Sequence, residues 1–115
     1  MSHKPVIALT MGDPAGIGPE ICLRAMADAE VLERCDPILV GDVDIIRELA
    51  RRLALPFPDR VVTPAEFDSG RSAAGSAVCP ASALRVEDIT PGKVQQRCGQ
   101  ASYQYIETAI RLAMQ

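Results

Sequence analysis

The chain is 115 residues long, which is enough sequence for one domain and too little for two well-packed cores. Hydrophobic residues make up 48% of it and charged residues 23%, so the composition excludes a disordered or fibrous protein. A net charge of −3 and only 3% aromatic residues exclude the basic field and the stacking platforms that nucleic-acid binders use.

The apolar runs are too short for a membrane span or a secretory signal. None approaches the roughly 20 residues that cross a bilayer, and the run after Lys4 is shorter than the about 7 residues that a signal peptide needs. The four cysteines are Cys22, Cys35, Cys79 and Cys98. They form no C-x-x-C pair, so we expect reduced and mostly buried thiols. From the short apolar runs and the net negative charge, we expect a cytoplasmic protein with neither a membrane nor a nucleic-acid partner.

The first expected element is a strand over residues 5–10. Its unbroken run of apolar and β-branched residues is typical of a strand covered on both faces in a parallel sheet. A glycine-rich turn follows, and Pro19 and Glu20 then open a helix, because proline loses no hydrogen bond at a helix start and an acidic residue favours the positive helix end. The expected apolar face of this helix holds Ile21, Cys22, Ala25 and Met26.

Residues 36–42 predict a second buried strand that ends in a turn. Asp42 is placed to cap the next helix, which we expect over 43–55. The apolar side chains of this helix follow the i, i+3, i+4, i+7 template at Ile46, Leu49, Ala50 and Leu53. On its charged outer face, Glu48 and Arg52 form an i, i+4 pair that contributes a few tenths of a kcal/mol, roughly.

Weaker signals follow, and then one strong helix. The expected elements are short strands at 60–63, 77–79 and 84–86, a flexible loop at 69–76, a turn at 91–92 and a helix from Gly99 to Gln115. One face of that helix holds Tyr103, Ile106, Ile110 and Ala113, and Tyr105, Ala109 and Leu112 widen the apolar arc. We therefore expect this helix to be largely buried.

The alternation of strands and helices predicts an α/β fold with a mostly parallel sheet and crossover helices. In such a fold a buried helix usually delivers the chain to another strand, and no strand follows the last helix. We therefore expect the sheet to be incomplete and the chain to be the front part of a longer protein.

The stretch with the most chemical information is residues 10–20, TMGDPAGIGPE, where a strand passes into a helix. Open α/β sheets usually contact ligands at such a place. Gly16 and Gly18 allow close approach to bare backbone, and the first N–H groups of the helix favour a phosphate or carboxylate. The stretch is not a Walker A loop, because Pro-Glu follows Gly18 where Lys is needed. It is not a dinucleotide fingerprint either, because Ile21 stands at the third glycine position.

Two interpretations of this stretch stay open. Asp13 is placed to accept a hydrogen bond from a substrate or cofactor, or else to close an Asx-type turn beside Pro14. In the same way, the whole glycine-rich turn either faces a ligand cleft or only joins a strand to a helix.

The string TMGDPAGIGPE resembles the opening signature of the PdxA family, the 4-hydroxythreonine-4-phosphate dehydrogenases of pyridoxine biosynthesis. It is more distantly similar to the GDGIGPE opening of isocitrate and isopropylmalate dehydrogenases. Residues 38–42 resemble the second strand and turn of the PdxA family, and 91–93 with Gly99, Ala101, Tyr103 and Ile106 resemble a later helix. The resemblance implies an isocitrate/isopropylmalate dehydrogenase-like fold, in which residues 1–115 are the N-terminal segment of a two-domain enzyme.

The resemblance also implies an activity, namely NAD- or NADP-dependent oxidation and decarboxylation of 4-phosphohydroxy-L-threonine. In the family a divalent metal (Zn, Mg or Co) held by histidines polarises the reacting oxygen, and the enzyme is a homodimer with its active site between two domains. The only histidine of this chain is His3, and one imidazole cannot build a metal site. No catalytic or metal-binding residue is therefore carried over, and the candidate cleft residues are Asp13, Gly16 and Gly18.

We expect the 115-residue chain alone to be inactive, because it lacks the metal ligands. Two alternatives remain. The chain is part of a PdxA-like relative that acts on 4-phosphothreonate or a cis-dihydrodiol acid, or it is a stand-alone, non-catalytic α/β module.

Overall fold

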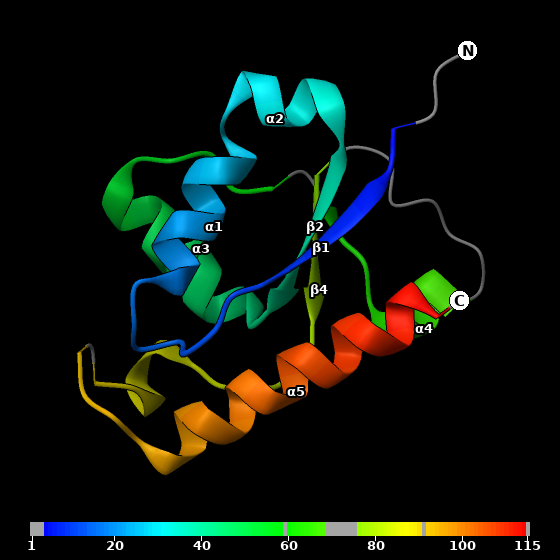
Figure 1. The fold of residues 1–115 in the computed structure, drawn as a ribbon. Coiled ribbons are helices and arrows are strands. Elements are labelled where there is room, and N and C mark those ends of the chain that lie inside the picture. The colour runs from blue at the N-terminus through cyan, green and yellow to red at the C-terminus, as the bar shows by residue number, and fades with distance from the viewer. Residues whose placement is uncertain (1–3, 59, 69–75, 91, 115) are drawn as a thin grey trace.

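The protein folds around one parallel sheet, which the computed structural model describes together with its helices for residues 4–58, 60–68, 76–90 and 92–114 (Figure 1). The strands are β1 (Val6–Thr10), β2 (Asp36–Gly41), β3 (Arg60–Val61) and β4 (Ala77–Pro80). Their order across the sheet is β1-β2-β4-β3, and every neighbouring pair is parallel. The predicted α/β fold with a parallel sheet is therefore confirmed.

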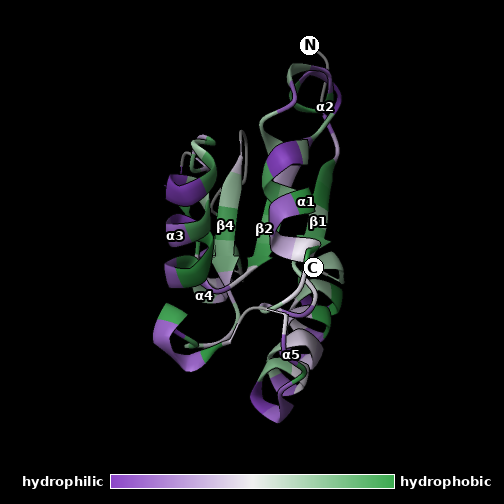
Figure 2. Ribbon diagram, turned by 90° about the vertical axis from the view of Figure 1, so that its left-hand side faces the viewer, coloured by the Kyte–Doolittle hydropathy of each residue, from purple (hydrophilic) through white to green (hydrophobic). Residues whose placement is uncertain are grey.

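Helices cover both faces of this sheet. The helices are α1 (Gly18–Met26), α2 (Ala29–Arg34), α3 (Val43–Leu53), α4 (Pro64–Asp68) and α5 (Gln96–Ala113), with a short 3-10 turn η1 (Val86–Asp88). Helix α1 packs against α3, whereas α5 packs against α4, β1 and β2. Right-handed crossovers place α1 and α3 on one face of the sheet and α4 on the other, and α5, which follows the last described strand, packs beside α4. Figure 2 shows the hydrophilic side of α3 turned away from the strands.

The core lies along the two central strands. Leu39 and Val40 of β2 and Val78 of β4 are fully buried, as continuous apolar runs in a parallel sheet should be. Most core residues are aliphatic, as the composition requires. The largest fully buried side chain is Tyr105 of α5, which brings an aromatic ring and a hydroxyl into this interior.

The prediction that the first strand is covered on both faces is wrong. β1 lies at the edge of the sheet, and Val6 and Ile7 keep 48% and 44% of their surface exposed. An apolar run shows only that a strand can be buried. The position of that strand in the sheet is set by its pairing with strands that are distant in the sequence. The sequence therefore could not distinguish an edge strand from a central one.

The predicted faces of the first and last helices are right only in part, since the expected Tyr105, Leu112 and Met26 are buried whereas other members of the predicted faces are exposed. On α5, Tyr103, Ile106 and Ile110 are 67%, 49% and 57% exposed. The buried side of α5 instead holds Cys98, Ala101, Tyr105, Thr108 and Leu112. Both stripes have helical spacing, so the spacing alone does not decide which one faces the sheet. On α1, Ile21 is 57% exposed, whereas Leu23 is fully buried.

The remaining differences concern short elements and element ends. Helices α2 and α4 were not predicted, and 84–86 is not a strand, since η1 occupies part of it. α2 is capped by Asp28, whose Oδ1 accepts hydrogen bonds from the N–H groups of Glu30 and Val31 at 2.8 and 3.3 Å. The expected loop at 69–76 lies outside the described residues except for its last position.

Two expectations about composition hold in the described part of the chain. The four cysteines form no disulfide with one another, and all except the half-buried Cys22 are buried. Among the described helices, none combines the length and the apolar character that a bilayer crossing requires.

Candidate functional site

The glycine-rich stretch forms a tight loop between β1 and α1, at the carboxyl end of the first strand. Gly12 has a φ of +68°, a conformation that L side chains rarely adopt. A Cβ atom on Gly18 would lie 2.3 Å from the carbonyl oxygen of Met11, so α1 can start this close to β1 only with glycine there. Gly18 therefore serves the packing of the loop itself.

Asp13 closes a turn inside this loop. Its side chain is exposed, and its Oδ1 accepts a hydrogen bond from the N–H of Ala15 at 2.8 Å. The N–H of Gly16 donates to the carbonyl of Asp13 at 2.9 Å and tightens the same turn. The Asx-turn interpretation of Asp13 is thus confirmed, and its role toward a ligand stays a prediction.

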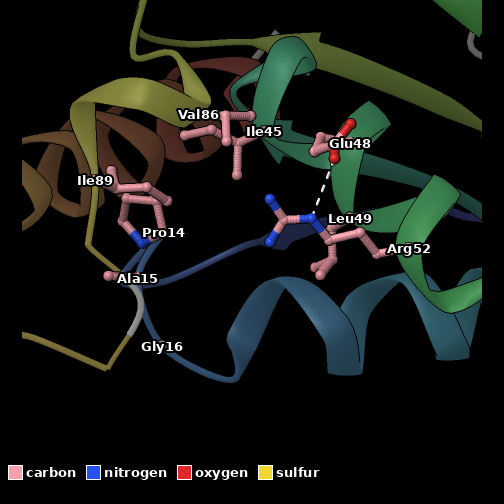
Figure 3. Close-up of a pocket in the computed structure, with 9 residues that line it drawn as sticks. All are labelled: Pro14, Ala15, Gly16, Ile45, Glu48, Leu49, Arg52, Val86 and Ile89. Atoms are coloured by element: carbon pink, nitrogen blue, oxygen red, sulfur yellow. Dashed lines mark hydrogen bonds and ion pairs between the residues drawn. The ribbon is translucent and has the colours of Figure 1, made fainter.

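Beside the loop lies a cleft of about 370 Å³ (Figure 3). It is lined by Pro14, Ala15 and Gly16 of the loop, Ile45, Glu48, Leu49 and Arg52 of α3, and Val86 and Ile89 of the η1 segment. These segments follow β1, β2 and β4, so the cleft opens at the carboxyl edge of the parallel sheet, the usual place for ligands in this architecture. Of the predicted site residues, Gly16 lines the cleft, whereas Asp13 and Gly18 are not among its lining residues.

The charged rim of the cleft is a compact ion cluster on α3. Arg51 binds the carboxylate of Glu48 through Nε at 3.0 Å and Nη2 at 2.5 Å, and Arg52 Nε binds it at 3.1 Å. Hydrogen bonds from Arg51 and then from Arg52 hold the pKa of Glu48 at about 2, so this carboxylate stays ionised at neutral pH. The predicted pair of Glu48 with Arg52 is confirmed, and Arg51 joins it.

A buried polar node follows β2. Asp42 is only 1% exposed, and its carboxylate accepts hydrogen bonds from Ser82 Oγ at 2.7 and 2.6 Å, from the N–H of Leu84 at 3.2 Å and from the hydroxyl of Tyr105. Burial, followed by the bond to Asp42, raises the pKa of the Tyr105 phenol. Asp42 stands at the N-cap position of α3, as predicted, but its side chain makes no capping bond there. It ties α5 and the chain after β4 to the end of β2.

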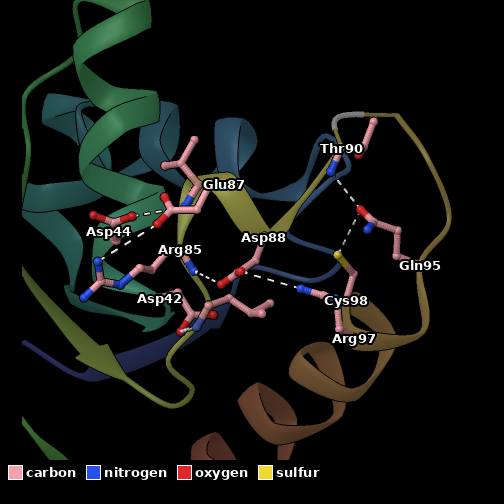
Figure 4. A network of polar contacts seen from close by, with 11 residues as sticks. Asp42, Asp44, Arg85, Glu87, Asp88, Thr90, Gln95, Arg97 and Cys98 are labelled. Carbon is pink, nitrogen blue, oxygen red and sulfur yellow. Dashed lines mark hydrogen bonds and ion pairs between the residues drawn. The ribbon is translucent and has the colours of Figure 1, made fainter.

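A second set of bonds holds the segment that carries η1 (Figure 4). Asp44 of α3 accepts a hydrogen bond from the N–H of Val86 at 3.0 Å. Asp88 accepts one from the N–H of Arg85 at 2.9 Å and forms an ion pair with Arg97 of α5 at 3.5 Å. One wall of the cleft is therefore fixed to helices on both sides of the sheet.

Sequence reasoning found the loop but missed the node. Asp42 was noticed, because an acidic residue directly follows a buried strand, yet it was interpreted as a helix cap. Its partner Tyr105 is 63 residues away, and no local pattern links the two positions. The signal that could have pointed to the node is the phenol of Tyr105, which together with Thr108 brings a hydroxyl to the buried face of α5.

The described residues do not fit a metal centre. In the parts of the chain that the structure describes, no three His, Cys, Asp or Glu side chains come close enough to hold an ion. His3 lies outside those parts. The divalent metal that the resemblance implies is therefore not matched by a ligand set in this described region.

Comparison with curated proteins finds relatives over nearly the whole chain. A protein of Clostridium botulinum (strain Hall), provisionally assigned as a D-threonate 4-phosphate dehydrogenase, is 32% identical over 117 residues, which cover 98% of this chain and 34% of the relative. A protein of Oceanobacillus iheyensis with the same assignment is 33% identical over 119 residues, with the same coverage. The chain thus spans about a third of the length of these relatives. No family model matches the chain.

Solved structures also match over nearly the whole chain. A 4-hydroxythreonine-4-phosphate dehydrogenase from Burkholderia phymatum matches with a TM-score of 0.79 and 29% identity, over 98% of this chain and 34% of its own. The enzyme of that name from Klebsiella pneumoniae has a TM-score of 0.73 at 25% identity, over 98% and 34%. A terephthalate 1,2-cis-dihydrodiol dehydrogenase from Burkholderia xenovorans has a TM-score of 0.69 at 29% identity, over 97% and 31%. The matches share a dehydrogenase name and differ in substrate.

Proposed function

We propose that the chain belongs to the PdxA family of dehydrogenases and forms the N-terminal segment of a two-domain, NAD- or NADP-dependent oxidoreductase. It matches about a third of the length of the relatives that carry these names. The observation that carries this proposal is the match over 98% of the chain, in sequence and in fold, to proteins named as dehydrogenases. The position of the loop supports it, because Gly16 lines a cleft at the carboxyl edge of the sheet.

We propose a phosphorylated hydroxy acid as the substrate. The first candidate is 4-phosphohydroxy-L-threonine, in pyridoxine biosynthesis, since solved relatives carry that name. The second is D-threonate 4-phosphate, which the assignment of the curated relatives favours. Both carry a secondary hydroxyl and a phosphate. A dihydrodiol acid, as in the name of the Burkholderia xenovorans enzyme, is a third possibility that lacks the phosphate.

The contribution of this chain to such a reaction is a wall of the substrate or cofactor cleft. The loop presents backbone at Gly16, and the second carboxylate oxygen of Asp13 is open to a hydrogen bond from a ligand. We further propose a cytoplasmic homodimer that uses a divalent metal (Zn, Mg or Co). The described residues offer no ligand set for that ion, so its ligands would come from other parts of the enzyme.

The test compares two proteins. The product of the complete reading frame is assayed for reduction of NAD and NADP with 4-phosphohydroxy-L-threonine, D-threonate 4-phosphate and a cis-dihydrodiol acid, with and without a chelator. We expect turnover with one phosphorylated substrate and loss of turnover with the chelator. The 115-residue chain should reduce neither cofactor.

Two results would contradict the proposal. The first is the absence of turnover with every substrate, in a protein that folds and binds metal. The second is metal-dependent turnover by the 115-residue chain itself. A reading frame that stops after residue 115 would favour the stand-alone, non-catalytic module.

A further inference from the structure

We propose that the cleft between the glycine-rich loop, α3 and η1 is a binding site for a small organic acid with an apolar body and one anionic group. Every residue named in the lining belongs to the described part of this chain. The inference therefore does not rest on the dehydrogenase activity, and it is tested on the 115-residue chain itself.

The body of the cleft is apolar. Ile45 and Leu49 of α3 line the cleft together with Val86 and Ile89 of the η1 segment, and Pro14 of the loop lies beside Ile89. Ile45 is only 4% exposed, and the other three aliphatic residues pack partly buried against the core. At about 370 Å³ the cleft falls within the range of small-molecule sites, which are mostly apolar with a few polar groups.

The charged side chains that line the cleft are Glu48 and Arg52. Glu48 carries one negative charge, and its carboxylate is already occupied by Arg51 and Arg52. With Arg51, which lies outside the lining, they sum to a net charge of about +1, and the Asp44 carboxylate on the N–H of Val86 offsets this charge. The attraction for an anion therefore comes from Arg52 locally, beside a Glu48 carboxylate that its two arginine partners neutralise.

Arg52 supplies the donor that an anion needs. It binds Glu48 through Nε, and among the described residues it has no other partner. Figure 3 shows its guanidinium group turned across the cleft toward the loop, so that the Nη atoms face the space above the apolar floor. A planar guanidinium fork matches the geometry of a carboxylate or a phosphate.

The walls are held in place before any ligand arrives. The N–H of Val86 is fixed by Asp44 of α3, and the N–H of Gly92 donates to the carbonyl of Ala15 at 2.8 Å. Together with the Asx turn at Asp13, these bonds fix both sides of the cleft. A preformed cleft avoids the entropic cost of ordering loops on binding.

The test is a titration of the isotope-labelled chain followed by NMR. Benzoate and phenyl phosphate are the probes. Benzamide, which keeps the ring without the charge, and acetate, which keeps the carboxylate without the ring, are the controls. We expect saturable shifts at the amides of Gly16, Leu49 and Val86 with either probe, and weaker binding of both controls. The relative affinities of the two probes identify the preferred anionic group.

Matched variants separate the cleft from general electrostatics. Arg52→Gln should weaken probe binding by about tenfold, the effect of losing one charge-assisted hydrogen bond. Arg47→Gln removes the same charge from the same helix, but Arg47 lies over the ring of Phe57, 5.1 Å from its centroid, and does not line the cleft. It should leave binding nearly unchanged. Absence of saturable shifts at the cleft amides, or equal losses in both variants, would overturn the proposal.

Discussion

The buried bond between Tyr105 and Asp42 gives the sharpest test of the structure. Tyr105→Phe removes the hydroxyl and keeps the ring in a fully buried position. A hydrogen bond to a charged group is worth about 1.5–3 kcal/mol. Since Asp42 keeps its bonds from Ser82 and Leu84, we expect the lower part of that range, a loss of about 1.5–2 kcal/mol in the free energy of unfolding. For a domain with about 5–15 kcal/mol in total, this loss is large.

Urea unfolding followed by far-UV circular dichroism measures this change. We expect a lower midpoint with an unchanged m-value, because the folded state buries the same surface. The same helix offers a matched control, because Tyr103 is 67% exposed and Tyr103→Phe should change the stability by less than about 0.5 kcal/mol. Equal effects of the two substitutions would refute the conclusion that the Tyr105 hydroxyl stabilises the node at Asp42.

Two further predictions concern the loop and the ion cluster. Gly18→Ala should destabilise the protein by about 1–3 kcal/mol, because the added Cβ meets the Met11 carbonyl. The control is Gly99→Ala in α5, where nothing lies within 4 Å of the added Cβ, and it should stabilise the protein by up to about 1 kcal/mol. Thermal unfolding compares the two variants, and equal effects would contradict the close approach of Gly18 to Met11. The pKa of Glu48 is lowered to about 2, so its contribution to stability is present above the unfolded-state pKa of about 4.3 and is lost as the pH falls toward 2. An NMR titration of the Glu48 carboxyl carbon checks this, and Arg51→Gln should raise the pKa; a normal value in the unsubstituted chain would show that the ion cluster does not form.

The features that the sequence predicted are those with a local cause. The buried strand at 36–42 and the helix that follows it are specified by apolar periodicity, and the glycine-rich loop by residue types that only a tight turn requires. α3 ends slightly earlier than expected, at Leu53, because Ala54 adopts a left-handed conformation with φ of 55°.

The features that the sequence did not predict depend on contacts between distant segments. The apolar residues of α5 form two stripes, and only the packing of the sheet decides that Tyr105 faces inward and Ile106 outward. The cleft is built from three segments that meet because the strand order is β1-β2-β4, which no local pattern encodes. Because the cleft depends on this strand order, the sequence could not show that Gly16 lines it, whereas Asp13, three residues earlier, closes the turn through its bond to Ala15.

The edge position of β1 affects how the isolated chain behaves in solution. In a parallel pair, alternate residues bond to one neighbour, and the bonds from Asp36 to Pro5 and from Met11 to Val40 show which ones face β2. The backbone groups of the residues between, such as Ala8, point outward, beside the exposed side chains of Val6 and Ile7. An uncovered strand of this kind is a template for another chain. Concentrated samples of the 115-residue chain are therefore prone to self-association by intermolecular sheet extension that starts at this strand.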